Sequence, residues 1–162
     1  HKRRLHTSEN TRMTLKGKTS GFTLVELMVT VAIVALLSTI SISSYRRYLM
    51  RTNRTEATAA LLQIQVGQEK FYLQNNSYAS NANITTAAPT GLGLVSVTTL
   101  PGGYYTLAIT STNLANGYTV TATPVSGKGQ AQDAECTVFS VDQTGRKTAL
   151  GGSTDTTAKC WK

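Results

Sequence analysis

The stretch GFTLVELMVTVAIVALLSTISISSY, residues 21–45, contains a single charged residue, Glu26. After it, residues 27–45 form a run of 19 positions without a charge, close to the roughly 20 with which a helix crosses a bilayer. An ionised side chain within such a segment costs about 2.5–3.5 kcal/mol on insertion scales. The position of Glu26 therefore needs an explanation.

Charge is concentrated at the two flanks of this apolar run. The chain has 162 residues and a net charge of +8, and its length allows one domain with a core plus an appendage. Residues 1–21 carry a net +5, and residues 46–54 contribute Arg46, Arg47, Arg51 and Arg54, whereas residues 55–162 balance six basic against six acidic side chains. Flanking cations are typical of cytoplasmic retention and of contact with lipid headgroups. The composition does not require a nucleic-acid groove.

The histidines and cysteines limit the chemistry of the chain. His1 and His6 both precede the apolar run, so removal of that leader excludes a Ser-His-Asp mechanism and any imidazole-bound metal. Cys136 and Cys160 form an even count beyond an export signal, which suggests a disulfide that closes a loop of about 25 residues. The alternative, a redox or metal pair, lacks CxxC spacing and a partner ligand. We expect no enzymatic activity, no cofactor and no metal.

The rest of the chain predicts one long helix followed by a sheet. Apolar side chains recur with one-sided helical spacing after the four arginines, at Ala57, Ala60, Leu61, Ile64, Phe71 and Tyr72. No proline occurs between 22 and 88, so a single helix from about Phe22 to about Gln74 is expected. Residues 75–102 are expected to form a loop and residues 151–162 a loop-like end. Between these loops, alternating runs predict antiparallel strands at 104–110, 118–124 and 136–142, with a short fourth at 146–150.

An ordinary secretory signal is cleaved after its hydrophobic region, whereas here the small residue Gly21 precedes it. GFTLVELMVTVAIVALL resembles the prepilin signature of type IV pilins, and the layout of residues 13–162 is similar to theirs. The segments GQEKFYLQNNSYAS and GQAQDAECTVFSVDQTGRKTALGGSTDTTAKCW resemble minor pilins of the PilE kind. The resemblance implies an α+β type IV pilin fold, with a long N-terminal helix packed on an antiparallel sheet and a disulfide-closed C-terminal loop.

The resemblance also implies a processing site and an assembly residue. A prepilin peptidase would cut between Gly21 and Phe22 and N-methylate Phe22, and Glu26 would face the ammonium group of Phe22 on a neighbouring subunit. Pairing relieves the cost of a buried charge. The resemblance implies three parts: a leader over residues 1–21, a transmembrane or filament-core half of the N-terminal helix over residues 22–54, and a globular domain over residues 55–162. A chain that starts at Met13 is an alternative for the leader. Ala35 and Ser43 stand where many pilins have a glycine and a helix-bending proline.

The implied function is a structural pilus subunit for motility, adhesion or DNA uptake. Its partners would be other pilin subunits, both major and minor, together with the prepilin peptidase and the pilus assembly machinery. The protein would lie in the inner membrane before assembly and in an extracellular pilus after it. Three alternatives stay open: a type II secretion pseudopilin, against which the cysteine pair argues, a plain anchored domain whose Glu26 snorkels, and a DNA-binding competence pilin. The last would need a basic cluster from Lys128, Arg146, Lys147, Lys159 and Lys162.

The remaining charged and aromatic residues are given structural roles. Asp133 and Glu135 are expected to be solvated loop charges, and calcium binding by these two with Asp142 is only weakly indicated. Trp161, beside Cys160, is expected to pack against the domain. For the arginines of residues 46–54, stop-transfer and neck packing are favoured over binding of DNA or anionic lipid.

Overall fold

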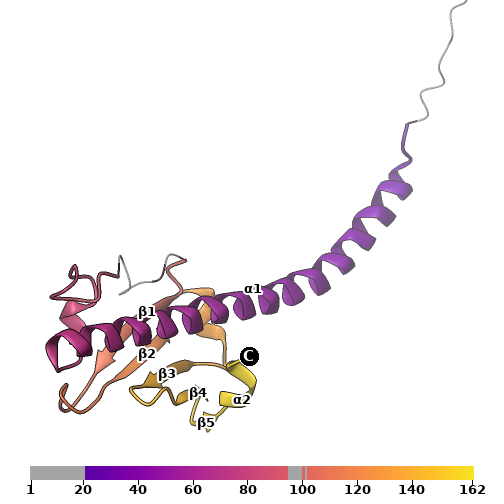
Figure 1. The fold of residues 1–162 in the computed structure, drawn as a ribbon. Helices are drawn as coiled ribbons and strands as arrows, with labels where there is room; N and C mark the ends of the chain where they lie inside the picture. The colour runs from indigo at the N-terminus through magenta and orange to yellow at the C-terminus, as the bar shows by residue number, and fades with distance from the viewer. Residues whose placement is uncertain (1–20, 95–99, 101) are drawn as a thin grey trace, which may run out of the picture. The chain divides into compact units, whose positions relative to one another are not determined.

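The computed structural model describes residues 21–94, 100 and 102–162. The chain divides into two compact units, His1–Ser41 and Ile42–Lys162, and each is described by itself. Helix α1, Leu24–Asn75, belongs to both (Figure 1). The prediction of one continuous helix is confirmed, with ends within two residues of those expected. The predicted leader, apart from Gly21, lies outside the described residues.

The first unit consists of the apolar start of α1. The helix is capped by Thr23, whose hydroxyl accepts a hydrogen bond from the backbone N–H of Glu26 at 3.2 Å, and an acidic side chain in the first turn is favourable to the helix dipole. Serine hydroxyls return hydrogen bonds to earlier carbonyls, as Ser38 does to Val34 at 2.7 Å. Because these hydroxyls are satisfied within the helix, they do not interrupt it in the isolated chain.

The second unit holds an antiparallel sheet with strand order β1-β2-β3-β4-β5. Pairs such as Leu107 with Ala122, Val120 with Val141 and Phe139 with Ala149 fix its register. The predicted strands are confirmed, and their bounds are Tyr105–Thr110 (β1), Thr119–Pro124 (β2), Val138–Asp142 (β3) and Lys147–Gly151 (β4).

The expectation of a loop over residues 151–162 needs correction. This segment forms the short strand β5, Thr154–Asp155, and one turn of helix, α2, Thr157–Cys160. Thr157 explains the turn, because its hydroxyl accepts the N–H of Ala149 at 2.9 Å and so ties the segment to β4. The other connections contain the 3-10 turns η1, Asn81–Asn83, and η2, Gly129–Gln132.

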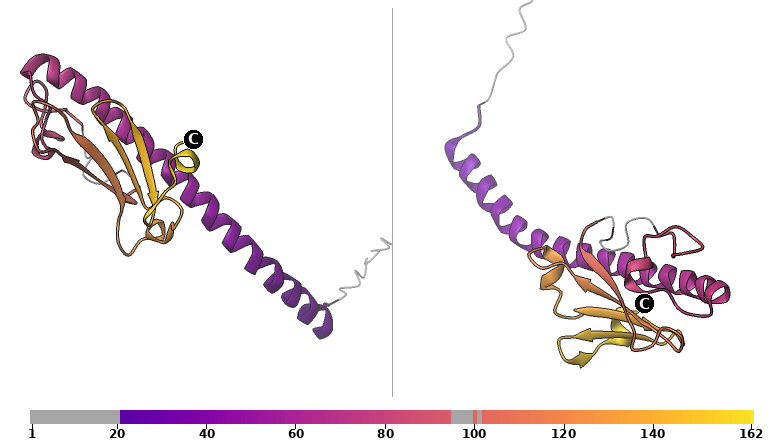
Figure 2. Two further views of the ribbon diagram at one scale, coloured as in Figure 1. Left: turned by 90° about the horizontal axis from the view of Figure 1, so that it is seen from below. Right: turned by 90° about the vertical axis from the view of Figure 1, so that its left-hand side faces the viewer.

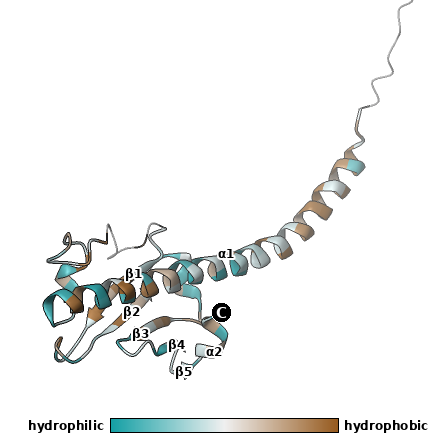
Figure 3. Ribbon diagram, viewed as in Figure 1, coloured by the Kyte–Doolittle hydropathy of each residue, from teal (hydrophilic) through white to brown (hydrophobic). Residues whose placement is uncertain are grey.

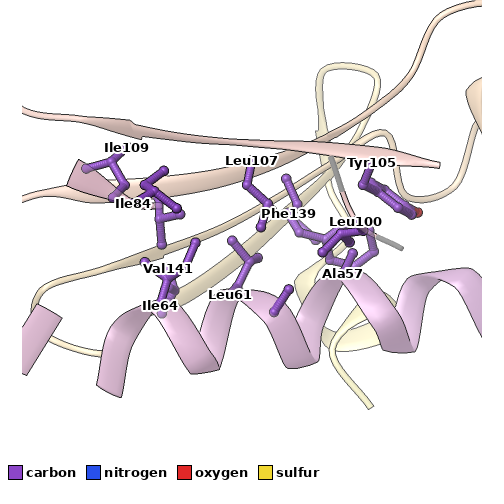
Figure 4. Packing of buried hydrophobic residues seen from close by; sticks show 14 of the residues in the cluster. Ala57, Leu61, Ile64, Ile84, Leu100, Tyr105, Leu107, Ile109, Phe139 and Val141 are labelled. Atoms are coloured by element: carbon purple, nitrogen blue, oxygen red, sulfur yellow. The ribbon is translucent and has the colours of Figure 1, made fainter. Parts of the chain in front are cut away.

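The core lies between the sheet and the part of α1 that belongs to the second unit (Figure 2). Figure 4 shows Leu61 and Ile64 directed toward the strands, where they meet residues such as Phe139 and Val141. Burial of one face of this helix segment is what its helical spacing predicts. Gln68 lies on the same face and is fully buried, and its amide exchanges two hydrogen bonds with the backbone of Ala79, at 2.9 and 2.7 Å.

Candidate functional site

Among the described residues of its own unit, 21–41, nothing covers the apolar start of α1. Its large side chains are exposed, as illustrated by Leu24 at 74% and Leu36 at 70%. By length and composition α1 could cross a membrane, and none of its apolar 18-residue window is buried. Figure 3 shows apolar positions recurring along this part of the helix. Soluble monomers rarely expose so much contiguous apolar surface, so this segment requires lipid or other helices around it.

Glu26 and Gly21 are the sequence-predicted residues at the start of this segment. Glu26 is exposed in the first turn of α1 and forms no ion pair within the part of the chain that the structure describes. Among the residues that the structure describes, none has an atom within 4 Å of where a Cβ at Gly21 would stand. The described fold therefore leaves room for a larger side chain at this position. The roles assigned to both residues stay predictions.

Arg54 holds the loop that precedes β3. Its Nε and Nη2 atoms donate to the two carboxylate oxygens of Asp133, each at 2.6 Å, and the side chains of this pair are 12% and 3% exposed. The hydrogen bond to Asp133 raises the pKa of Arg54 above its ordinary value. The expectation that Asp133 is a solvated loop charge was wrong, because a guanidinium 79 residues away compensates its burial.

Glu135 extends this ion pair toward the C-terminal segment. It accepts hydrogen bonds from Nζ of Lys159 at 2.6 Å and from Nη2 of Arg54 at 3.1 Å. The hydrogen bond from Lys159, followed by that from Arg54, lowers the pKa of Glu135. Its side chain is 48% exposed, so the prediction of a solvated charge fits Glu135 better than Asp133.

Gln130 completes a buried polar network that sequence reasoning missed. The side chain is 1% exposed, and its amide nitrogen contacts the Tyr105 hydroxyl at 2.7 Å and Asp133 Oδ2 at 3.1 Å. Its amide oxygen accepts from Asn53 on α1 at 3.0 Å. Burial raises the pKa of Tyr105. Partners 77 residues apart leave no local pattern, so nothing in the sequence pointed to this network.

The predicted disulfide between Cys136 and Cys160 is present, with 6.0 Å between the Cα atoms and a sequence separation of 24. Trp161 packs as expected: its ring lies edge-on to Phe139 with centroids 6.1 Å apart, and its indole N–H donates to the Thr148 carbonyl at 2.8 Å. The disulfide and the tryptophan together fasten the C-terminal segment onto the sheet.

Most of the basic residues suggested for nucleic-acid binding contact separate partners. Lys128 lies 5.7 Å from the ring centroid of Tyr104, and Lys147 lies 5.3 Å from that of Trp161. Arg146 pairs with Asp142 at 3.3 Å. Each of these three cations thus has its own partner, and for two of them the partner is an aromatic ring.

The calcium alternative finds no support among the described residues. Asp133 and Glu135 are engaged by Arg54, whereas Asp142 accepts backbone N–H groups from its own turn, at 2.9 Å from Thr144 and 3.1 Å from Arg146. Within residues 21–94, 100 and 102–162, no three acidic, histidine or cysteine residues are grouped to hold a metal ion.

Comparison with known families gives two matches. Residues 43–140, more than half of the chain, match the family described as "Type IV minor pilin ComP, DNA uptake sequence receptor". Residues 16–42 match the prokaryotic N-terminal methylation motif. The second match covers the predicted cleavage site and Glu26, and the first covers the ion pair and most of the sheet.

Individual relatives of this chain are also named as type IV pilins or pilus components. The chain is 41% identical over 76 residues to the type IV wide pilus major component PilA4 of Thermus thermophilus, a match to 47% of this chain and 55% of the relative. It is 35% identical over 69 residues to the type IV major pilin protein PilA of Myxococcus xanthus, over 43% of this chain and 31% of that protein. The chain therefore spans between about a third and just over half of the length of these relatives.

A solved type IV pilin from Shewanella oneidensis aligns with 70% of this chain and 98% of its own, at 21% identity. Its TM-score is 0.44, too low for the alignment to add to the comparison of sequences.

Proposed function

The chain belongs to the type IV minor pilin family, and we propose that it is a structural subunit of a type IV pilus. The observation that carries this proposal is the uncovered apolar start of α1, whose 18-residue window has no buried residue. In a membrane, lipid would surround this segment. In a filament, the same segments of neighbouring subunits would surround one another, which replaces lipid contacts by helix packing.

Maturation removes the leader in this account. A prepilin peptidase cuts between Gly21 and Phe22 and N-methylates Phe22. The match of residues 16–42 to the methylation motif supports this step, as does the free space around Gly21 within the described part of the chain. Before assembly the apolar helix anchors the protein in the inner membrane, and after assembly it lies in the extracellular pilus.

Glu26 serves assembly in the same account. Its carboxylate pairs with the ammonium group of Phe22 on the neighbouring subunit. A carboxylate without a partner in the described part of its own chain is costly to bury, and an opposite charge from a second subunit removes most of that cost. The pair would favour the register in which both charges meet.

DNA binding is the second candidate, because the matched family is described as a DNA uptake sequence receptor. On this chain the favourable feature is the proximity of cations to aromatic rings, Lys147 to Trp161 and Lys128 to Tyr104, a combination that nucleic-acid surfaces use. Electrophoretic mobility shifts of duplex DNA with the full chain, at increasing salt, test it. Binding that weakens with salt and with Lys147→Gln supports a DNA receptor, and binding unaffected by either contradicts it.

Mass spectrometry of sheared surface filaments tests the main proposal. We expect peptides of this chain in the filament fraction, with an N-terminal peptide that starts at Phe22 and carries one added methyl group. Recovery from the membrane alone would contradict a pilus subunit. If secretion were also lost on deletion of the protein, that outcome would favour the pseudopilin alternative.

A further inference from the structure

Two adjoining clefts share Arg51, Arg54 and Glu135 as lining residues. Their volumes are about 340 and 330 Å³, at the lower end of the range for small-molecule sites. The first lies between α1 and the C-terminal segment, where Lys159 and Lys162 line it. The second reaches along α1 to Arg47. Both lie within the unit Ile42–Lys162.

The side chains around these clefts carry an excess of positive charge. The two carboxylates that line them, Asp133 and Glu135, are already engaged by Arg54 and Lys159 at 2.6 Å each. Three further cations form no hydrogen bond or ion pair within the part of the chain that the structure describes; they are Arg47, Arg51 and Lys162. The clefts therefore have an unmatched charge of three that an external anion can neutralise.

Three arginines line these clefts from α1. Arg47, Arg51 and Arg54 are spaced i, i+4 and i+7 along α1, so they lie on one helix face. Arg54 is held in place by its two hydrogen bonds to Asp133. The side chain of Arg51 is exposed and has no hydrogen-bond partner among the described residues. Guanidinium groups bind phosphate oxygens in a bidentate manner. The clefts thus have the chemistry of a phosphate site.

We propose that these clefts bind the phosphate of an anionic phospholipid headgroup while the protein is anchored in the membrane, an inference that rests on the anchoring in the proposed function. The sequence identifies the source of the phosphate. Arg47 follows the 19-residue uncharged run by two positions, which puts it where a spanning helix leaves the hydrocarbon and meets headgroups. Residues 55–162 are electrically neutral as a whole, which favours a local headgroup site over a long duplex.

The test uses the full chain in nanodiscs of mixed phosphatidylcholine and phosphatidylglycerol. Native mass spectrometry counts the lipids that stay bound when the protein is ejected. We expect retained phosphatidylglycerol on the parent and a roughly fivefold loss for Arg51→Gln, because one cation near anionic lipid contributes about that factor. Arg47→Gln combined with Arg51→Gln and Lys162→Gln should remove the retained lipid. Lys70→Gln, an equal charge change on an exposed residue of the same helix, should retain it.

The competing occupants give different results. Displacement of the retained lipid by millimolar inorganic phosphate would overturn the headgroup assignment in favour of a free phosphate site, and displacement by duplex DNA would overturn it in favour of nucleic acid. Equal retention of both lipids, or equal loss in Lys70→Gln and Arg51→Gln, would also overturn it. A chain that enters the discs without this preference contradicts the inference alone, whereas a chain that does not enter them contradicts the anchoring as well.

Discussion

The guanidinium of Arg54 and the carboxylate of Asp133 form a two-bond ion pair, with both donor–acceptor distances 2.6 Å, across 79 residues of sequence. One partner lies on α1 and the other in the loop that leads to β3. With Gln130 beside it at 3.1 Å from Asp133, the pair connects the helix to the loop that directly precedes the disulfide cysteine Cys136. This contact makes the C-terminal half of the domain dependent on the helix.

Arg54→Met should reduce the free energy of unfolding of the globular unit by about 3 kcal/mol, because it leaves the buried Asp133 carboxylate without an opposite charge. Adding Asp133→Leu should recover most of that loss. Denaturation by urea, followed by fluorescence of Trp161, the single tryptophan, measures both. Arg146→Met is the control, since this arginine is 77% exposed in its pair with Asp142 and should cost less than about 1 kcal/mol. Equal losses in Arg54→Met and Arg146→Met would show that the buried pair has no special role.

The helix and the strands could be predicted from residues close together in sequence. The uncharged run and the one-sided spacing of Leu61 and Ile64 indicated one helix, and alternation indicated the strands. Gln68 could have been found as well, because it lies four residues beyond Ile64 on the same buried face.

Residues whose environment depends on distant contacts could not be predicted in this way. The sequence around Asp133 is typical of a surface loop, and only the fold shows that Arg54 on α1 lies next to it. Gln130 likewise has partners on α1 and β1, which are far away in the sequence. Strand β5 is two residues long, too short for an alternating pattern. At the N-terminal end the sequence motif was more informative than the fold, because the partners that Glu26 requires are on other chains in the proposed filament.

Loss of the disulfide should destabilise the globular unit by about 3 kcal/mol, the loop-closure estimate for cysteines separated by 24 in the sequence. We expect a lower urea midpoint for Cys136→Ser combined with Cys160→Ser, and the same shift for the parent after reduction. The double variant serves as the control for the reductant, which should leave its midpoint unchanged. Alkylation of both thiols in the folded, unreduced parent would contradict the pairing.

Acid should destabilise the domain partly through Glu135. Its pKa is lowered in the folded state by Lys159 and then Arg54, so the stabilisation is present above the ordinary glutamate pKa and is lost as the pH falls through the lowered value. We expect the melting temperature to fall as the pH drops below about 4. Glu135→Gln should show a smaller fall over the same range, whereas Glu69→Gln should follow the parent. A parent whose melting temperature does not change in this range would contradict the assignment.

Gly21→Leu should leave an uncleaved precursor without disturbing the fold. A Cβ at this position meets no atom of the described residues within 4 Å, so we expect the effect to arise at the peptidase. Intact-mass measurement of the membrane fraction should show the leader retained on the variant and removed from the parent. Gly67→Ala, at a glycine within α1 that has room for a Cβ at 3.6 Å from Leu92, should be processed normally. Normal maturation of Gly21→Leu would place the cut elsewhere.

The amount of Glu26→Gln protein in sheared filaments, divided by the amount in the membrane, tests the pilin account most directly. The variant keeps the shape of the side chain and removes its charge, so membrane insertion and cleavage should persist. Incorporation should fall at least about tenfold, because the ammonium of the neighbouring Phe22 would be buried without a partner. Glu69→Gln, the same change at an exposed site of α1, should be incorporated like the parent. Equal filament-to-membrane ratios for the parent and Glu26→Gln would contradict the ion-pair account of assembly.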